Sequence, residues 1–243
     1  MIISKRIDII SHWIKTYADE NKFKLVIGVS GGIDSAVTSA LCARTNIKTI
    51  VISMPIRQNE KQYNLSLEHI NWLKLKYNNI IDYTINLDDV FKSFKNTMNS
   101  FKSELAFANS RSRLRMTALY QVAQSNNALV VGTGNKVEDF GIGFYTKYGD
   151  GGVDISPIAD CTKTQVWEMG KEIGISKKII EAKPTDGLWD DSRNDEDQIG
   201  LSYDKLEEAM KNPHSQYFEK YNQIRKPNLH KMKPIPICKF DEE

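Results

Sequence analysis

The 243-residue chain carries 33 basic and 31 acidic residues, a formal net charge of +2, and 40% of its residues are hydrophobic. A chain of this length and apolar content can bury a substantial core. The balanced charge gives no broad positive surface of the kind that wraps nucleic acid, so no nucleic-acid partner is expected. Any anionic ligand therefore has to be held by a local site.

The N-terminal segment and the cysteines both favour a cytoplasmic protein. Residues 1–20 place apolar side chains at helical spacing between charges and hold no continuous apolar run, so we expect an amphipathic helix and no signal peptide or membrane span. Cys42, Cys161 and Cys238 are widely spaced and form no CxxC pair. They suit neither a disulfide framework nor a zinc site, and we interpret them as reduced thiols.

Short apolar, β-branched runs alternate with helical stretches over the first half of the chain. Continuous apolar strands alternating with helices predict a doubly wound α/β fold, a mostly parallel sheet with helices on both faces. We expect a single domain over 1–243, with the sheet within about 20–175 and a helical C-terminal part over about 176–243. The expected strands are 23–29, 49–54, 80–87 and 128–133, and the expected helical segments between them are 33–44, 59–77 and 89–126.

The first strand runs into VSGGIDS and then into a helix. This junction points backbone N–H groups and a helix dipole at one place, which suits a phosphate. Gly31 and Gly32 allow backbone conformations closed to other residues, and Ser30 and Ser35 add hydroxyl groups. Asp34 would repel a phosphate unless a cation lay between them, so the loop predicts Mg²⁺ bridging carboxylate and phosphate oxygens. A plain Ser-Gly turn, with Asp34 at the positive end of the helix, is the alternative.

A second loop follows the strand at 128–133 and should reach the same edge of the sheet, because ligands bind beyond the carboxyl ends of parallel strands. Glu138 comes shortly after this strand and is a candidate second magnesium ligand; a solvated helix charge is the alternative. The following stretch, GIGFYTKYGDGGVD, contains Lys147, Asp150 and Asp154 among many glycines. Its composition fits a mobile loop as well as a binding loop.

Thr162 and Gln165 have the spacing of a capping box that opens a helix. Lys163 then lies in the first turn, where its charge opposes the helix dipole at a cost of a few tenths of a kcal/mol to about 1 kcal/mol. A bound anion would reverse that sign, so we expect Lys163 to reach a phosphate; a tolerated surface lysine is the alternative.

The arginine-rich stretch NSRSRLRM, residues 109–116, is expected to be helical. On helical spacing Asn109 and Arg113 share one face, whereas Arg111 and Arg115 share another. From the spacing alone, a solvated basic helix face is the favoured interpretation.

The full string SGGIDS at a strand-to-helix junction resembles the phosphate loop of the ATP pyrophosphatase (PP-loop) superfamily, with its adenine nucleotide alpha hydrolase-like fold. Its members cleave ATP between the α and β phosphates and transfer AMP to an oxygen of the substrate. FYTKYGDGG, followed by an aspartate, a proline and TK, closely resembles the NAD synthetase family within that superfamily. The resemblance covers nearly the whole chain and includes NSRSRLRM and KPTDGLW (183–189).

The resemblance implies a ligase that completes NAD biosynthesis in two steps. The carboxylate of nicotinic acid adenine dinucleotide (deamido-NAD) attacks ATP to give an acyl-adenylate and pyrophosphate, and ammonia then displaces AMP to give NAD. Neither step needs a protein nucleophile, so positioning and charge neutralisation suffice. The chain starts some two dozen residues before the loop, where glutamine-using relatives carry an amidase domain, so we expect free ammonia as the nitrogen donor.

The resemblance also assigns residues. Asp150 is expected to receive ammonia or its proton, and Lys163 is the other catalytic residue. Asp34 and Glu138 are the implied Mg²⁺ ligands. The implied ATP site comprises Gly28, Val29, Ser30, Gly31, Gly32, Ile33, Asp34, Ser35, Thr133, Lys163 and Thr185. The implied deamido-NAD site comprises Asn109, Arg113, Lys147, Asp154, His230 and Lys231.

Some features depart from the family or leave alternatives open. SMPIRQ (53–58) stands where many relatives have an arginine before Leu-Pro, so the adenine contact of that arginine is not carried over. The acidic run 186–198 is interpreted as a lid or a disordered segment. The family implies a homodimer. The competing hypotheses are another adenylating ligase of this superfamily, such as a GMP synthetase core, and a regulator that binds ATP without turnover.

Overall fold

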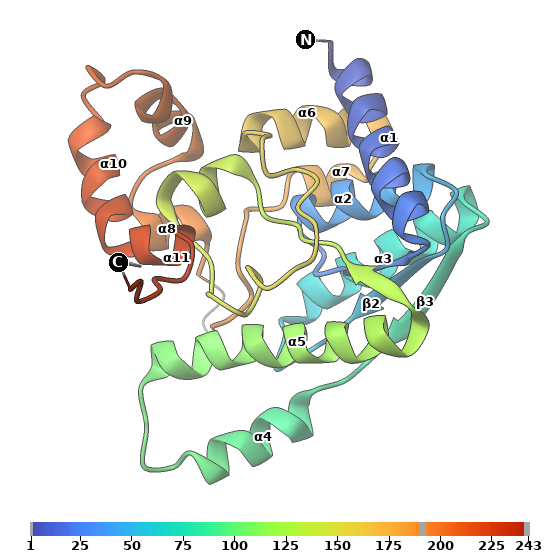
Figure 1. Cartoon of the computed structure of the whole chain (residues 1–243), viewed down its shortest axis with the longest axis horizontal. Coiled ribbons are helices and arrows are strands. Elements are labelled where there is room, and N and C mark those ends of the chain that lie inside the picture. Colours follow the sequence, from blue (N-terminus) through green and yellow to red (C-terminus); the bar gives the residue numbers. More distant parts are fainter. Residues whose placement is uncertain (1, 190–192, 241–243) are drawn as a thin grey trace.

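Four parallel strands form one sheet in the order β3-β2-β1-β4 in the computed structural model, which describes residues 2–189 and 193–240 (Figure 1). The central strand β2 is buried at every residue, as its continuous apolar sequence predicts for a strand covered on both faces. Strand β1 lies between β2 and β4. The strands are β1 (Lys24–Gly28), β2 (Thr49–Ser53), β3 (Ile80–Thr84) and β4 (Ala128–Val130).

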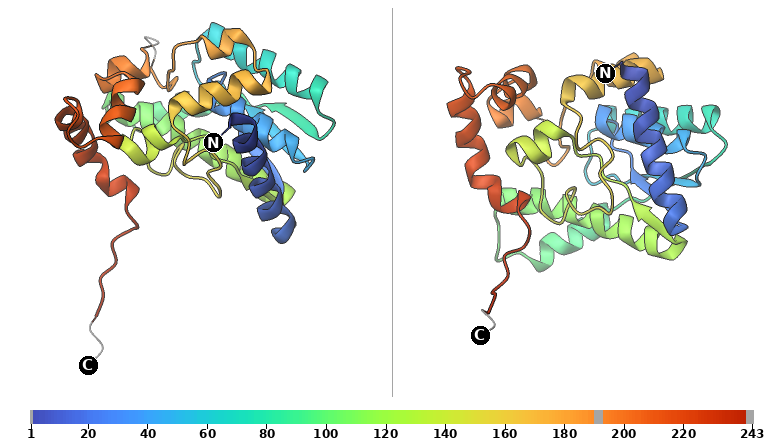
Figure 2. Two further views of the ribbon diagram at one scale, coloured as in Figure 1. Left: turned by 90° about the horizontal axis from the view of Figure 1, so that it is seen from above. Right: turned by 45° about the horizontal axis from the view of Figure 1, so that its top comes forward.

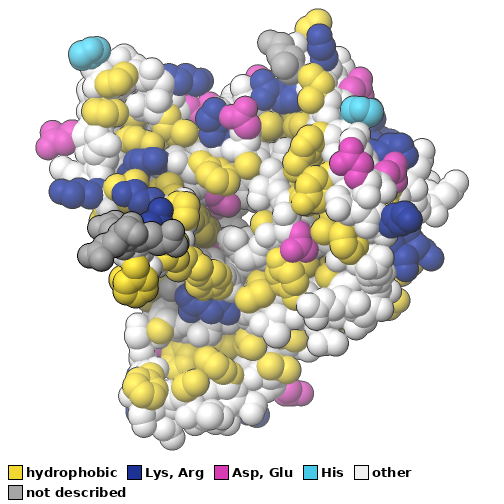
Figure 3. All heavy atoms as spheres, in the orientation of Figure 1, with side chains coloured by type: hydrophobic (Ala, Val, Ile, Leu, Met, Phe, Trp, Pro, Cys, Tyr) yellow, Lys and Arg dark blue, Asp and Glu magenta, His cyan; other side chains and the backbone are white. Residues whose placement is uncertain are grey.

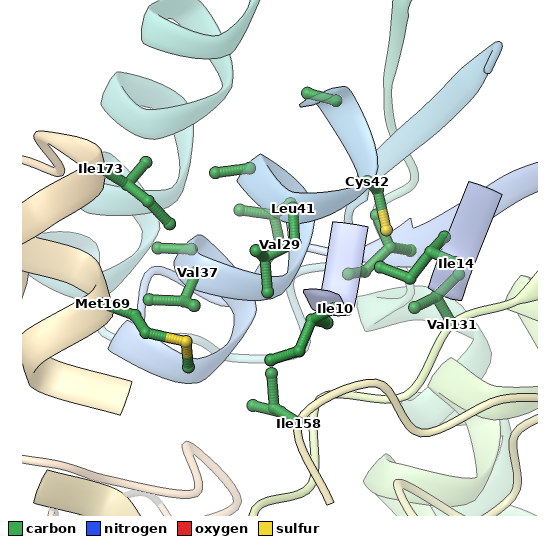
Figure 4. Close-up of a cluster of buried hydrophobic side chains, with 14 of the residues drawn as sticks. Ile10, Ile14, Val29, Val37, Leu41, Cys42, Val131, Ile158, Met169 and Ile173 are labelled. Carbon is green, nitrogen blue, oxygen red and sulfur yellow. The ribbon is translucent and has the colours of Figure 1, made fainter. Parts of the chain in front are cut away.

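Helices cover both faces of the sheet, which confirms the doubly wound fold. Because side chains alternate along a strand, Leu25 and Ile27 enter one apolar cluster and Val26 enters the other. Figure 4 shows the first of these clusters, in which Ile10, Val37 and Met169 come together from three helices. The helices on that face are α1 (Ile3–Asn21), α2 (Ile33–Arg44), α3 (Glu60–Lys76), α6 (Lys163–Ile173) and α7 (Lys177–Ile180); those on the other face are α4 (Asp88–Thr97) and α5 (Glu104–Asn126).

The expected helix over 89–126 is two helices, α4 and α5. Met98 ends α4, and Ser103 caps α5 by accepting a hydrogen bond from the backbone N–H of Ala106. The sequence between them, MNSFKS, is rich in residues that bond to nearby backbone and so favour helix ends over helix interiors. Turn chemistry thus outweighed the helical spacing in this stretch.

The helices that follow α7 confirm the expected helical C-terminal part, and together with the earlier π-helix η1 they form a third group of elements. Val137 and Tyr203 belong to its apolar cluster, which packs the C-terminal helices against the π-helix η1. Beyond them, residues 233–240 run away from the body as an exposed extended segment (Figure 2). The elements of this C-terminal layer are η1 (Lys136–Ile142), α8 (Asp195–Ile199), α9 (Tyr203–Lys211), α10 (Phe218–Arg225), the 3-10 helix η2 (Lys226–Asn228) and α11 (Leu229–Met232).

Two further expectations concern the cysteines and the membrane. Cys42 and Cys161 are buried free thiols, and Cys238 is an exposed one. Among the residues described, no helix is long and apolar enough to cross a bilayer.

The strand order places a topological switch point between β1 and β4. The chain leaves β1 through α2 toward β2, whereas β4, on the other side of β1, is reached through α4 and α5. The loops after β1 and β4 therefore open beside each other, where doubly wound sheets bind ligands.

Candidate active site

The loop after β1 has the geometry of an anion-binding loop. Gly31 adopts a φ of 90°, and a Cβ on it would collide with the backbone carbonyl oxygen of Gln62 in α3, so only glycine fits. The hydroxyl of Ser35 accepts a hydrogen bond from the backbone N–H of Ser30 at 3.2 Å and lies 3.1 Å from the hydroxyl of Ser30. The N-terminus of α2 then opens on a cleft, as the sequence predicts.

Asp34, Lys163 and Glu138 meet beside this loop. The Nζ of Lys163 lies 2.6 Å from Oδ2 of Asp34 and 2.8 Å from Oε1 of Glu138, and the lysine is 1% exposed. Burial disfavours its charged form, but the two carboxylates raise the pKa of Lys163 above its usual value. The same ammonium and a hydrogen bond from Tyr203 lower the pKa of Glu138 in spite of burial. This buried cation lies beside the loop after β1, where the sequence predicts a phosphate site.

The start of α6 explains how Lys163 reaches that place. Thr162 caps the helix by accepting from the backbone N–H of Gln165, and the Gln165 side chain accepts from the backbone N–H of Thr162 in return, so the predicted capping box is confirmed. Lys163 is not a tolerated surface lysine, because its charge is neutralised inside the protein. Its contact with a phosphate stays a prediction.

Asn135, which the sequence analysis did not single out, joins the two loops. Its buried side chain donates from Nδ2 to Oδ1 of Asp34 at 3.1 Å. Its Oδ1 accepts from the backbone N–H groups of Val137 and Glu138, which caps the π-helix that carries Glu138. π-Helical turns are rare in proteins, and those that occur are often found at functional sites. The cap could have been suspected from the asparagine that follows the strand and glycine turn.

The trio lies in a cavity of about 340 Å³, here called the phosphate cleft. The sequence did not single out Arg57, Lys61 or Lys183, which also line it, because an isolated basic residue gives no signal until the fold shows which loops meet. Most of the predicted ATP residues line this cleft: Ser30, Gly31, Gly32, Ile33, Asp34, Ser35, Thr133, Lys163 and Thr185.

The remaining predicted ATP residues, Gly28 and Val29, line an adjoining cavity of about 150 Å³, here called the apolar cavity. It shares Ser30, Ser35 and Thr133 with the phosphate cleft. Apolar walls next to a phosphate loop suit a nucleotide base. Its other lining residues include Met54, Met116, Leu119 and Val153.

A third cavity of about 390 Å³, here called the basic cleft, lies between α5, the loop 143–151 and α11. Two hydrogen bonds of 3.3 Å link these elements. Nε of Arg113 donates to the backbone carbonyl of Lys147, and Nζ of Lys147 donates to the backbone carbonyl of His230. The cleft brings together all but one of the predicted substrate residues, namely Asn109, Arg113, Lys147, His230 and Lys231.

Asp154 is the exception, because it lies outside the three cavities. Its Oδ2 accepts from the backbone N–H of Val130 at 2.8 Å, and its Oδ1 accepts from the hydroxyl of Tyr120 at 3.0 Å. Asp154 therefore attaches its loop to β4 and α5, and a role in substrate binding stays a prediction.

Asp150 lies where the three cavities meet and lines each of them. Its Oδ1 accepts from the hydroxyl of Ser112 at 2.6 Å and from the backbone N–H of Thr146 at 2.9 Å. No hydrogen bond from another described residue reaches Oδ2. The surrounding protein raises the pKa of Asp150 by desolvation, against the lowering effect of these two donors. One carboxylate oxygen is thus fixed and the other is available at the junction.

The acidic run 186–198 contributes to the walls of these cavities. Residues 190–192 lie outside the described part of the chain. Asp186 and Trp189 line both the phosphate cleft and the basic cleft, and Asp195 begins α8. The described part of the run therefore lies at the site, and its role as a lid stays a prediction.

A doubly wound sheet with a phosphate loop and a buried acid–lysine–acid cluster at its switch point defines a nucleotide-binding α/β protein. The model of the family described as NAD synthase matches residues 6–238. The NH(3)-dependent NAD(+) synthetase of Carboxydothermus hydrogenoformans is 38% identical over 205 residues, 82% of either chain. That of Finegoldia magna is 32% identical and covers 99% of this chain and 98% of its own.

Solved structures agree. The NMN synthetase from Francisella tularensis superposes with a TM-score of 0.91 at 31% identity and covers 99% of this chain and 100% of its own. The NH3-dependent NAD synthetase from Campylobacter jejuni, at 22% identity and a TM-score of 0.80, shares the fold. The chain belongs to the NAD synthase family and is an enzyme of the ligase class. The family resemblance seen in the sequence is confirmed, and the hypotheses of a GMP synthetase core or a non-catalytic regulator are not favoured.

Proposed function

We propose that the chain amidates deamido-NAD to NAD with ATP and ammonia. A carboxylate oxygen of the nicotinate ring attacks the α-phosphorus of ATP, the bond to the bridging oxygen of the β-phosphate breaks, and pyrophosphate leaves. Ammonia then attacks the acyl carbon, the bond to AMP breaks and a proton is lost from nitrogen. The observation that carries this proposal is the junction of a phosphate cleft and a basic cleft at Asp150.

In the first step the chain binds the triphosphate and neutralises charge. The backbone N–H groups of the loop 30–35 and the N-terminus of α2 face the phosphates. Lys163, held charged by its two carboxylates, would donate a hydrogen bond to a phosphate oxygen of the leaving pyrophosphate. The base of ATP would occupy the apolar cavity beside Gly28.

Asp34 and Glu138 fit a Mg²⁺ ion that arrives with ATP. Both carboxylates line the phosphate cleft, and each has one oxygen on the ammonium of Lys163. The part of the chain that the structure describes holds no cluster of three or more acidic, histidine or cysteine side chains suited to a metal on its own. Mg²⁺ is commonly bound by one or two carboxylates together with substrate phosphates, so two carboxylates suffice, and the ion would neutralise phosphate oxygens.

In the second step Asp150 is the group placed to handle ammonia. It lines all three cavities, and its raised pKa makes it a stronger base than an exposed aspartate. Asp150→Asn is therefore expected to leave pyrophosphate release within a few-fold of wild type and to slow amide formation at least tenfold. Equal loss of both half-reactions would contradict this role.

A mononucleotide substrate is the second candidate. The NMN synthetase from Francisella tularensis aligns with nearly the whole of both chains at the TM-score of 0.91. The carboxylate chemistry is the same for nicotinate mononucleotide, which lacks the AMP half of deamido-NAD. The two candidates differ only in what fills the basic cleft.

A homodimer in the cytoplasm is part of the proposal. Apolar side chains remain exposed on the outer side of α1, where Ile9, Trp13 and Tyr17 are 47%, 45% and 39% exposed, and next to the α4–α5 connection at Phe101 and Leu105 (Figure 3). Exposed apolar surface of this kind can pack against a second copy of the chain across a two-fold axis, and the mass of the protein in solution is the check.

The test is turnover by the purified protein with ATP and Mg²⁺. Deamido-NAD and nicotinate mononucleotide are offered separately, each with ammonium or with glutamine. NAD formed with ammonium supports the first candidate, and faster turnover of the mononucleotide would replace it with the second. Activity with glutamine in an ammonia-free assay would overturn the nitrogen donor, and the absence of AMP and pyrophosphate with either nucleotide would overturn both candidates.

A further inference from the structure

Tyr203 connects the C-terminal layer to two residues of the phosphate cleft, Glu138 and Lys163. It begins α9, is 2% exposed, and donates from its hydroxyl to Oε1 of Glu138 at 2.5 Å. The same oxygen accepts from Nζ of Lys163 at 2.8 Å. One oxygen of Glu138 is thus held by two donors.

The ring of Tyr203 also contacts the cation. Nζ of Lys163 lies 4.9 Å from the ring centroid, within the range of a cation–π interaction. The ring packs edge-to-face on Trp167 of α6, with centroids 5.7 Å apart and planes at 90°. Tyr203 therefore touches both members of the ion pair and the helix that carries Lys163.

Helix α8 fixes Tyr203 from the other side. The backbone N–H of Tyr203 donates to Oε1 of Glu196 at 3.0 Å, and the Tyr203 hydroxyl lies 3.4 Å from Oδ2 of the buried Asp195. The backbone N–H of Asp195 in turn donates to the carbonyl of Pro184, next to Thr185 in the phosphate cleft.

A chain of hydrogen bonds and ion pairs thus runs from α8 through Tyr203, Glu138 and Lys163 to Asp34 in α2. It joins four separate parts of the sequence and links the C-terminal helices to the phosphate loop. The same layer carries His230 and Lys231 of the basic cleft.

We infer that Tyr203 is a positioning residue for the ATP-dependent step. It orients the carboxylate of Glu138 and the ammonium of Lys163 toward the phosphate loop, so the C-terminal layer sets the geometry of the phosphate cleft. The inference rests on the proposed function for the identity of the reaction. The part of the inference that concerns nucleotide binding does not depend on that function. Loss of such outer hydrogen bonds costs roughly 10- to 100-fold in metal affinity or activity in metal sites.

Tyr203→Phe is the test variant, because phenylalanine keeps the ring on Trp167 and removes only the hydroxyl. Tyr221→Phe is the matched control. Tyr221 is 7% exposed in the same apolar cluster, and its hydroxyl donates to the carbonyl of Gly141 at 3.0 Å, away from the charged trio. The Tyr221 hydroxyl also accepts from Nη1 of Arg225 at 3.3 Å, so each variant loses a buried tyrosine hydroxyl with two partners.

Three quantities are measured for both variants: the melting temperature, kcat with its KM for ATP, and the affinity for α,β-methylene-ATP with and without Mg²⁺. We expect similar melting temperatures. We also expect kcat of Tyr203→Phe to fall roughly 10- to 100-fold, and the factor by which Mg²⁺ increases its affinity for the analogue to fall by a similar amount. Both quantities should stay within about threefold of wild type in Tyr221→Phe. In the absence of Mg²⁺ the two variants should bind the analogue alike.

Equal behaviour of the two variants in kcat and in Mg²⁺-dependent binding would overturn the inference and leave Tyr203 as a core residue. Failure of the wild-type protein to turn over either nicotinate nucleotide would count against the proposed function alone. In that case the Mg²⁺-dependent affinity for the analogue still decides the role of Tyr203.

Discussion

Lys163 lies in the first turn of α6 with its charge opposed to the helix dipole, and two carboxylates hold it there instead of solvent. The sequence could indicate this residue because the capping box fixed its place at the helix start. It could not indicate Asn135 or Tyr203, since their importance depends on which side chains the fold brings to them.

Lys163→Met is expected to destabilise the protein by about 3 kcal/mol, because removing one partner of a buried ion pair leaves Asp34 and Glu138 uncompensated. Activity should fall roughly 100-fold. Urea unfolding at about pH 7.5 gives the first quantity and steady-state kinetics the second.

Lys171→Met, an exposed lysine in the last turn of the same helix, is the control and should cost no more than about 1 kcal/mol. If the two variants unfold at the same urea concentration, the buried lysine contributes nothing to the stability of the cluster.

At the scale of elements, apolar periodicity was sufficient to predict the four strands and most of the helices. The apolar residues of β1, β2 and β4 are buried, and apolar periodicity in a sequence reflects such burial. The edge strand β3 is partly buried at Ile80 and Ile81 and exposed at its other residues. It failed between α4 and α5, where helical spacing continues through residues whose side chains bond to the backbone and end a helix. The π-helix that carries Glu138 has no such periodicity and could not be foreseen.

The loop between β1 and α2 allows a test with two adjacent glycines. A methyl group on Gly31 would collide with the backbone of α3, at a φ that other residues rarely adopt, whereas the closest atom to one on Gly32 is the Ser30 hydroxyl at 3.4 Å. Gly31→Ala should therefore lose roughly 1–3 kcal/mol of unfolding free energy. Gly32→Ala should lose about 0.5 kcal/mol or less.

Chemical unfolding of the two alanine variants compares them directly. Equal stability would mean that the loop relaxes away from α3, and that its left-handed glycine does not hold the loop in shape.

For the whole molecule, the sequence sufficed for the sheet edge at which ligands bind, because a strand order with a switch point follows from alternating strands and helices. The packing of the C-terminal layer over that edge could not be predicted from the sequence, because short helices joined by loops give no signal of where they pack. That packing brings His230 and Lys231 to the basic cleft and Tyr203 to Glu138, which lines the phosphate cleft. The three cavities share Asp150 in their walls only in the folded chain.

The central claim is that the nicotinate carboxylate attacks the α-phosphorus of ATP in the site that these cavities form. The measurement that tests it most directly is the fate of ¹⁸O placed in the carboxylate of deamido-NAD, or of nicotinate mononucleotide if that is the better substrate. The account predicts that one labelled oxygen appears in the phosphate of AMP and none in pyrophosphate. Label found in pyrophosphate or inorganic phosphate, or unlabelled AMP formed together with the amide, would contradict it.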